Sequence, residues 1–260
     1  KKYSEPTQIL TGNISKDTKL YKKEIYLLLG DVFVTDSASL TIEPGTKILG
    51  DFKTKASLTI TKGATIVAEG TQTDPIVFTS NKDVKKKGDW GGLFILGDAP
   101  ANKIGTQWDV NFGLDTSSTE NTMYGGENVA SNSGVIRFVR IEYAGKRTRD
   151  YGYFNSLTLA GVGNKTILEN IMVSHSAGNS FYISGGDVHL EKLVSYKSSG
   201  NDFRFDYGTF ASINNSLAVR SPYVSLPGGA SSIYITSHSG NTKIDIPYGC
   251  FLKDYRVCDW

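Results

Sequence analysis

The run Asp202-Phe203-Arg204-Phe205-Asp206 places two carboxylates and a guanidinium at alternate positions. Alternate side chains of a strand point to opposite faces, so we expect Phe203 and Phe205 to point into the core. Asp202, Arg204 and Asp206 then share the outer face. Two outward carboxylates could catalyse polysaccharide hydrolysis or elimination, and hydrolysis uses one carboxyl group as an acid. Alternatively, they could hold a calcium ion through their oxygens.

A repeat 22 residues earlier adds an aromatic ring to this patch. Gly178–Phe181 aligns with Gly200–Phe203, which puts Tyr182 in the column of Arg204. Tyr182 could offer a flat face to a sugar ring, so that the patch binds a glycan without chemistry. In the simplest interpretation the patch is a solvated ladder in which Arg204 pairs with both aspartates. Such exposed pairs contribute about 0.2–1 kcal/mol.

The repeat also indicates the fold. Leu168–Met172 aligns with Leu190–Val194 at the same shift of 22, and Leu40–Leu49 aligns with Leu58–Val67 at a shift of 18. Short alternating strands with Gly or Asn turns, without a helical pattern between them, are typical of a solenoid whose stacked coils share one core. We therefore predict an all-β fold, a single-stranded parallel β-helix with coils of 18 to 22 residues.

Composition agrees with a strand-rich chain and disfavours some partners. The 260 residues include 28 Gly, 14 Tyr and 12 Phe, and the net charge is only +2. A nucleic-acid-binding surface usually needs a concentrated basic excess, so no nucleic-acid partner is expected. The basic cluster Lys82–Lys87 is interrupted by Asp83 and is interpreted as a solvated loop. No apolar stretch is long enough to span a membrane.

The two ends depart from the repeat. Residues 1–24 are interpreted as an N-terminal tether and first cap, residues 25–246 as the β-helix, and residues 247–260 as a C-terminal cap. Cys250 and Cys258 both lie in the last segment, where a local disulfide would fit an oxidising compartment. Two reduced thiols are the alternative.

Residues 98–134 interrupt the coils as one long loop excursion rich in Asn, Gly, Asp, Ser and Thr. Its Trp108 and Tyr124 indicate that the excursion packs back on the coils. Functional residues concentrate on loops held by rigid scaffolds, so Trp108 and Tyr124 join Tyr182 and Arg204 as candidate binding residues. We expect deletion of residues 105–128 to abolish partner binding and to leave the thermal transition nearly unchanged.

Several further segments carry a family resemblance: Gly63–Ser80, Asp89–Leu93, Tyr124–Gly126, Ser133–Glu142 and Ser184–Gly186. Together they resemble the right-handed parallel β-helix surface lipoproteins of Bacteroidota. The resemblance implies a right-handed helix, a location at the outer-membrane surface or outside the cell, and membrane contact only through a lipid anchor ahead of residue 1. The acidic cluster of the family's late coils is thinned here to Asp202 and Asp206.

These observations predict a non-enzymatic binding, adhesion or accessory scaffold at the outer membrane, with a glycan or an outer-membrane protein complex as partner. The alternative is a polysaccharide lyase or glycoside hydrolase that uses Asp202 and Asp206. No cofactor is expected, apart from the calcium ion that these aspartates could hold. His175, His189 and His238 have no zinc-like spacing, and His175 is expected at an exposed turn.

Overall fold

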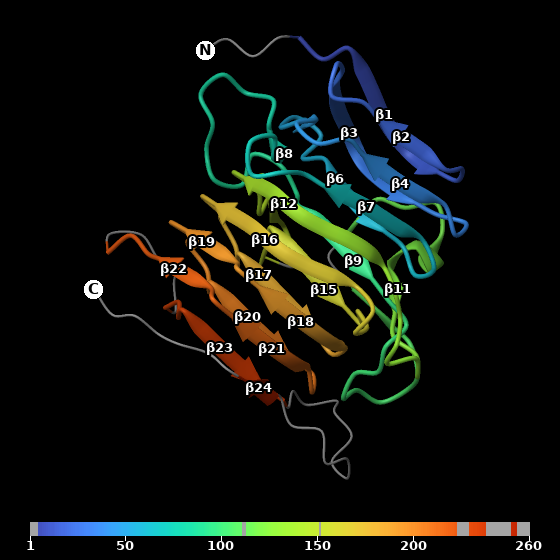
Figure 1. Cartoon of the computed structure of the whole chain (residues 1–260), viewed down its shortest axis with the longest axis vertical. Helices are drawn as coiled ribbons and strands as arrows, with labels where there is room; N and C mark the ends of the chain where they lie inside the picture. The colour runs from blue at the N-terminus through green and yellow to red at the C-terminus, as the bar shows by residue number, and fades with distance from the viewer. Residues whose placement is uncertain (1–4, 111–112, 151, 223–228, 238–250, 254–260) are drawn as a thin grey trace.

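The computed structural model describes residues 5–110, 113–150, 152–222, 229–237 and 251–253. These residues form strands and turns, with one short 3-10 turn, η1 (Thr119–Thr122). In Figure 1 the colour changes from blue to red along the long axis, so the chain advances along this axis coil by coil. None of the described helical residues belongs to a helix long and apolar enough to cross a membrane.

Three parallel ladders of hydrogen-bonded strands follow the three sides of the coils. Ladder A contains, in order, β1 (Gln8–Ile14), β3 (Ile25–Val34), β5 (Lys47–Gly50), β8 (Ile76–Ser80), the second half of β12 (Gly134–Glu142), the second half of β16 (Ile167–Ser174), β19 (Val194–Tyr196) and β22 (Leu217–Val219). Ladder B contains the ends of β1 and β3, then β6 (Ser57–Ile60), β9 (Leu93–Leu96), β15 (Leu157–Ala160), β17 (Phe181–Ser184), β20 (Phe203–Asp206) and β23 (Ile233–Thr236).

Ladder C forms the third side. It contains β2 (Thr18–Leu20), β4 (Ser39–Ile42), β7 (Thr65–Glu69), the first halves of β12 and β16, β18 (Asp187–Glu191), β21 (Phe210–Asn214) and β24 (Phe251–Lys253). Because the chain visits the three ladders in turn and every ladder is parallel, the predicted parallel β-helix is confirmed.

The coil period agrees with one of the two predicted repeats. Leu168 pairs with Leu190 and Phe181 with Phe203, so the shift of 22 is a true coil-to-coil register. The shift of 18 between residues 40–49 and 58–67 is wrong as a coil repeat, because Leu40 pairs with Ile66 and Leu58 with Val32. Its two copies lie on different sides of the helix, where similar strand-and-turn sequences recur.

Inward side chains of all three ladders fill one continuous hydrophobic core. On ladder B the inward Phe181 and Phe203 rings stack with centroids 5.2 Å apart. A column of asparagines also links the coils, at the entry to ladder B, where Asn179 Nδ2 donates to Asn155 Oδ1 at 2.7 Å. Asn201 donates to Asn179 Oδ1 through its backbone N–H at 2.8 Å and through Nδ2 at 3.0 Å. The repeated Asn of the sequence is thus a hydrogen-bonded ladder.

The excursion packs back on the coils, as predicted, and it does so against the outer face of ladder B. It contains the antiparallel pair β10 (Trp108–Asp109) and β11 (Met123–Tyr124), which lies on a small cluster that includes Phe94, Leu96 and Ala160. Gly134, at φ +107, returns the chain to ladder C so closely that a Cβ there would lie 2.0 Å from the Ile66 carbonyl oxygen. A smaller hairpin, β13 (Arg147–Thr148) and β14 (Gly152–Tyr153), precedes β15.

The ends of the chain differ in part from the expected organisation. β1 and β2 lie within residues 1–24, the predicted tether and first cap, and pair with β3 and β4. Strand pairing therefore begins at Gln8 rather than near residue 25, because the alternating pattern already supplies inward Leu10 and Leu20. Of the predicted cap at 247–260 only β24 is described. Cys250 and Cys258 lie outside the described residues.

Candidate functional site

The outer face of ladder B brings three of the predicted site residues together. Tyr182 pairs with Arg204, as predicted, and Arg204 pairs in turn with Tyr234 of the next coil. The Arg204 guanidinium lies between the two rings, 5.6 Å from the centroid of Tyr182 and 5.1 Å from that of Tyr234. This arrangement is a cation–π sandwich across three successive coils.

Asp206 fixes the position of Arg204 within the sandwich. Arg204 Nε donates to Asp206 Oδ2 at 2.8 Å, and the Tyr182 hydroxyl also hydrogen bonds to this carboxylate. The aspartate side chain is only 3 % exposed, against 35 % for that of Arg204. Burial raises the pKa of Asp206, although Arg204 and the Tyr182 hydroxyl both act in the opposite direction. The Asp206 carboxylate is therefore stabilised by the ion pair with Arg204 rather than by water, and it fixes the position of the guanidinium.

Asp202 does not share this site, contrary to the predicted outward patch. It is completely buried in the turn before β20, receiving hydrogen bonds from Ser195 Oγ at 2.5 Å and from Arg220 Nη1 at 2.7 Å. Alternation fails here because Asp202 precedes the strand, which begins at Phe203. Burial raises the pKa of Asp202, while Ser195 and Arg220 lower it. Each aspartate is thus held by its own arginine, and Arg204 does not bridge the two.

Trp108 and Tyr124 are buried, 9 % and 3 % exposed, rather than presented to solvent. Their ring centroids lie 5.8 Å apart, and the two rings cover Phe94 and Leu96. The Tyr124 hydroxyl hydrogen bonds to Ser184 Oγ at 3.0 Å, and burial raises its pKa to about 12. These two candidate binding residues therefore fasten the excursion to β17 and support the neighbouring surface from behind.

Lys103 joins the excursion to the ladder. Its ammonium lies 4.7 Å from the Tyr207 ring centroid, 5.5 Å from that of Tyr124 and 5.8 Å from that of Trp108. Burial lowers the pKa of Lys103, which fits an ammonium that has exchanged water for aromatic faces. We call Tyr182, Arg204, Tyr234, Tyr207 and Lys103 the aromatic–arginine surface.

Sequence reasoning missed three members of this surface. Tyr234 follows Arg204 by a longer coil than the 22-residue repeat, so the repeat did not reveal it. Tyr207 and Lys103 meet only because the excursion returns to ladder B, as the hydrogen bond from the Asn102 N–H to the Tyr207 carbonyl at 2.7 Å illustrates. No local signal marks such a contact.

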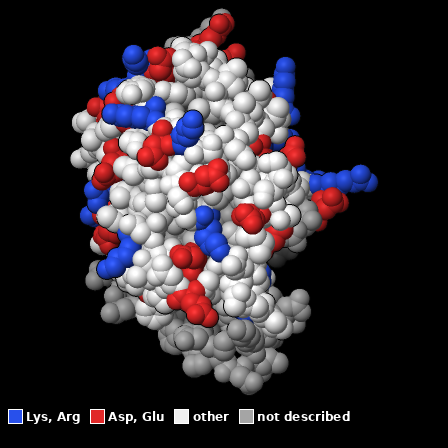
Figure 2. All heavy atoms as spheres, turned by 90° about the vertical axis from the view of Figure 1, so that its right-hand side faces the viewer, with Lys and Arg blue, Asp and Glu red and all other residues white. Residues whose placement is uncertain are grey.

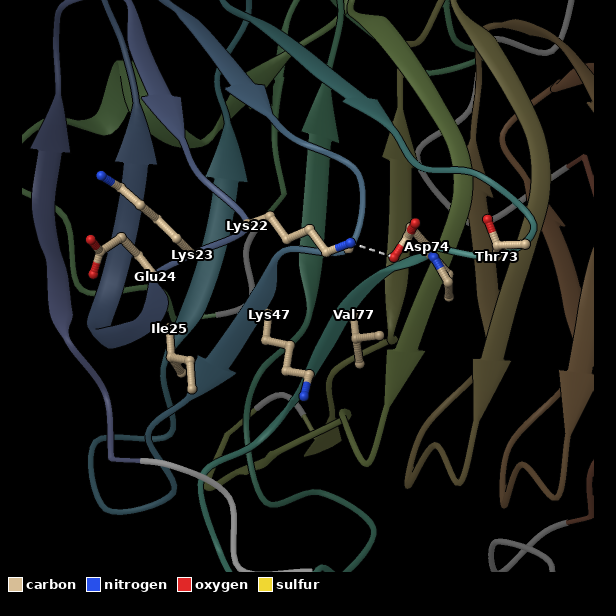
Figure 3. Close-up of a pocket in the computed structure, with 10 residues that line it drawn as sticks. Lys22, Lys23, Glu24, Ile25, Lys47, Thr73, Asp74 and Val77 are labelled. Carbon is tan, nitrogen blue, oxygen red and sulfur yellow. Dashed lines mark hydrogen bonds and ion pairs between the residues drawn. The ribbon is translucent and has the colours of Figure 1, made fainter.

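An open pocket lies elsewhere, at the corner between ladders C and A in the early coils. It is lined by Lys22, Lys23, Glu24, Ile25, Gly45, Lys47, Thr73, Asp74, Pro75 and Val77. Figure 3 shows Lys22 extended toward Asp74, and the Lys22 Nζ to Asp74 Oδ1 distance is 2.6 Å. This ion pair already neutralises Lys22, so the pocket offers an anionic ligand less positive charge than its three lysines indicate.

The predicted solvated loop at Lys82–Lys87 is partly buried instead. Lys85 Nζ donates to the Ser80 carbonyl, and to that of Lys82 at 2.9 Å, because the loop folds back on itself. Lys82 Nζ pairs with Asp89 at 3.3 Å. Burial lowers the pKa of Lys85.

Charges of both signs are interspersed over the described part of the face shown in Figure 2. This face therefore lacks the single-sign field typical of nucleic-acid surfaces. The described residues contain no group of three or more His, Cys, Asp or Glu that could hold a metal ion. Calcium binding remains a prediction, and one oxygen of each aspartate, Asp202 Oδ2 and Asp206 Oδ2, already accepts a hydrogen bond from an arginine.

Comparison with known proteins agrees with this architecture. A family model described as a pectate-lyase-like beta-helix domain matches residues 12–223, which include the strands from β2 to β22. No curated protein matches the chain. No solved structure matches it either.

Proposed function

Because the chain belongs to the pectate-lyase-like beta-helix domain family, we propose that it uses this rigid helix as a non-enzymatic binding module for a glycan. The aromatic–arginine surface would be the binding face. One observation carries the proposal: an arginine is fixed between two tyrosine rings that belong to the coils on either side of it, and Tyr234 is 44 % exposed. Flat rings and a held guanidinium suit stacking against a sugar and hydrogen bonding to its oxygens.

Preorganisation supports binding at this face. Asp206 fixes Arg204, and the core stack of Phe181 on Phe203 fixes the two strands beneath it. A ligand therefore meets side chains whose conformational entropy is already lost, which lowers the cost of association. The exposed tyrosine supplies contact area at a low entropy cost because it has only two side-chain torsions.

A panel of neutral and acidic polysaccharides tests the proposal, with retention on affinity gels followed by calorimetry on any that bind. Tyr234→Ala should weaken binding by about tenfold or more, because it removes one stacking face. Tyr21→Ala is the matched control, since Tyr21 is 43 % exposed and also lies near lysines, but on an early coil. Retention of no polysaccharide, or an equal loss in both variants, would contradict the proposal.

A polysaccharide-degrading activity is the second candidate. The observation that favours it is Asp206, a buried carboxyl group with a raised pKa beside Tyr182 and Arg204, since such groups can act as acids in catalysis. New reducing ends or unsaturated products from the same panel would reveal the activity. If Asp206→Asn left such an activity intact, the chemistry would have to lie elsewhere on the helix.

We further propose that this module works at the outer-membrane surface or outside the cell, as a lipoprotein of Bacteroidota type. The support is the sequence resemblance of the segments from Gly63 to Gly186. Protease treatment of intact cells that express the full-length precursor should cleave the protein. Complete protection, with cleavage only after lysis, would argue against surface exposure.

A further inference from the structure

The corner between ladders A and B carries a column of side chains outside the proposed glycan surface. Tyr143, His175 and Lys197 occupy the same corner position in consecutive coils, with φ of 61°, 55° and 54°. Their N–H groups continue the ladder, because that of His175 donates to the Tyr196 carbonyl at 2.9 Å. Lys197 donates in the same way to Val219, at 2.7 Å. Arg220 follows Val219 and is thus the next member of the column.

A further lysine reaches this column from a separate loop. Lys87 belongs to the segment between β8 and β9, and its Nζ donates to Ser199 Oγ at 2.9 Å. The Gly88 N–H donates to the Ala144 carbonyl at 3.1 Å, which holds the loop against the corner. Neighbouring coils are about 4.8 Å apart, so these side chains are close enough to act together. We call His175, Lys87, Lys197 and Arg220 the basic corner.

The basic corner contains more positive side chains than carboxylates that pair with them. Arg220 pairs with the buried Asp202 at 2.7 Å. Lys87 and Lys197 have no carboxylate within ion-pair distance among the described residues. Burial, then Arg220 and Lys197, lower the pKa of Lys87. Burial, then Lys87 and Lys197, lower the pKa of His175. The cations therefore repel one another, and an anion would relieve that repulsion.

Aromatic rings lie against two members of the basic corner, His175 and Lys197. His175 stacks on Tyr143 with centroids 4.9 Å apart and meets the edge of Tyr196 at 5.6 Å. Lys197 Nζ lies 5.0 Å from the Tyr196 ring centroid. His175 Nδ1 is buried and has no hydrogen-bond partner within the described part of the chain. The half-buried imidazole thus retains unused hydrogen-bonding capacity next to two lysines.

We propose that the basic corner binds an oxyanion, the carboxylate or sulfate group of an extended ligand, between Lys87, Lys197 and His175. Charge-assisted hydrogen bonds to such a group are about twice as strong as neutral ones. The tyrosine rings would contact the apolar part of the ligand that carries the anion. This site is distinct from the aromatic–arginine surface, and its existence does not depend on the function proposed for that surface.

Proton–nitrogen NMR of the His175 ring tests the site directly on the wild-type chain. Sodium sulfate and sodium glucuronate are titrated separately at constant ionic strength, with glucose as the neutral control. Binding of an anion should shift the His175 resonances in a saturable way and raise the imidazole pKa. Saturation with sulfate alone or with glucuronate alone identifies which oxyanion the site prefers. Glucose should leave His175 unchanged.

Two variants separate this site from nonspecific attraction of anions. Lys87→Met combined with Lys197→Met should weaken anion binding by more than about tenfold, because two charged donors are lost. Lys192→Met is the matched control. Lys192 also has a positive φ, 54°, but lies at the corner between ladders C and A. The Lys192→Met variant should bind the anion with the affinity of the wild type.

The proposal is overturned if neither anion produces a saturable shift at His175 in the wild-type chain. It is also overturned if the double variant, with a wild-type circular dichroism spectrum, binds as tightly as the control. The wild-type titration decides the matter by itself if the double variant fails to fold. A positive result here with no glycan retained at the Tyr234 face would leave this site standing and contradict the function proposed for that face.

Discussion

Individual side chains in this protein act mainly by linking one coil to the next. Hydrogen bonds link three coils at the entry to ladder B through Asn155, Asn179 and Asn201. In the core, the stacked rings of Phe181 and Phe203 link two coils. Tyr182, Arg204 and Tyr234 form a corresponding column on the outside. A side chain repeated at the coil period therefore contributes to stability and, where it is exposed, also makes a continuous surface.

Asn179→Ala should lower the free energy of unfolding by about 1–3 kcal/mol, because it leaves the Asn201 backbone N–H without its acceptor. The lost bond is 2.8 Å long and joins two coils. Urea denaturation followed by circular dichroism measures the loss. Asn13→Ala, at an exposed position of the edge strand β1, should change stability by less than about 0.5 kcal/mol. Equal effects of the two substitutions would contradict the role given to the ladder.

At the scale of elements, the excursion is part of the folded body. Trp108 and Tyr124 bury Phe94 and Leu96, and Asp115 N–H reaches Asp31 Oδ2 at 2.8 Å. The Asp31 carboxylate also pairs with Lys146 at 3.1 Å, and both side chains are nearly buried. The expectation that residues 105–128 can be removed without affecting the thermal transition therefore has no support in these contacts. Removal would expose apolar side chains of ladder B.

Trp108→Ala should destabilise the protein by about 3–5 kcal/mol, the usual cost of removing a buried tryptophan. Differential scanning calorimetry would show a lower transition temperature. Ile104→Ala is the control on the same excursion, because Ile104 is 65 % exposed. If Trp108→Ala left the transition unchanged, the packing of the excursion on the coils would not contribute to stability.

At the scale of the whole molecule, the protein is a stack in which the strands of each coil pair with those of the neighbouring coils. Such stacks gain stability from interfaces between repeats, so the end coils have one interface and the central coils have two. The burial pattern follows this rule: β9 and β15 are buried at every position, whereas β22 is exposed at Leu217 and Val219. The family match covers this same stack.

Hydrogen exchange measured by mass spectrometry should therefore be slowest in the central strands β9, β15 and β16. Exchange should be faster in β1 and β22, whose coils lie near the ends. A uniform exchange rate across all coils would instead indicate fully cooperative opening of the stack. Fastest exchange in β9 or β15 would contradict the packing described for the excursion.

The sequence by itself determined the fold class, the 22-residue register and the neighbouring positions of Tyr182 and Arg204. Local alternation and a repeat at fixed spacing carry that information, because coils stack in register. Tertiary structure alone decided the rest. Asp202 proved buried because a turn, not a strand, sets its direction, and Lys103 and Lys87 reached their partners only because loops fold back on the coils. Contacts between a loop and distant coils follow no period, so no repeat in the sequence could reveal them.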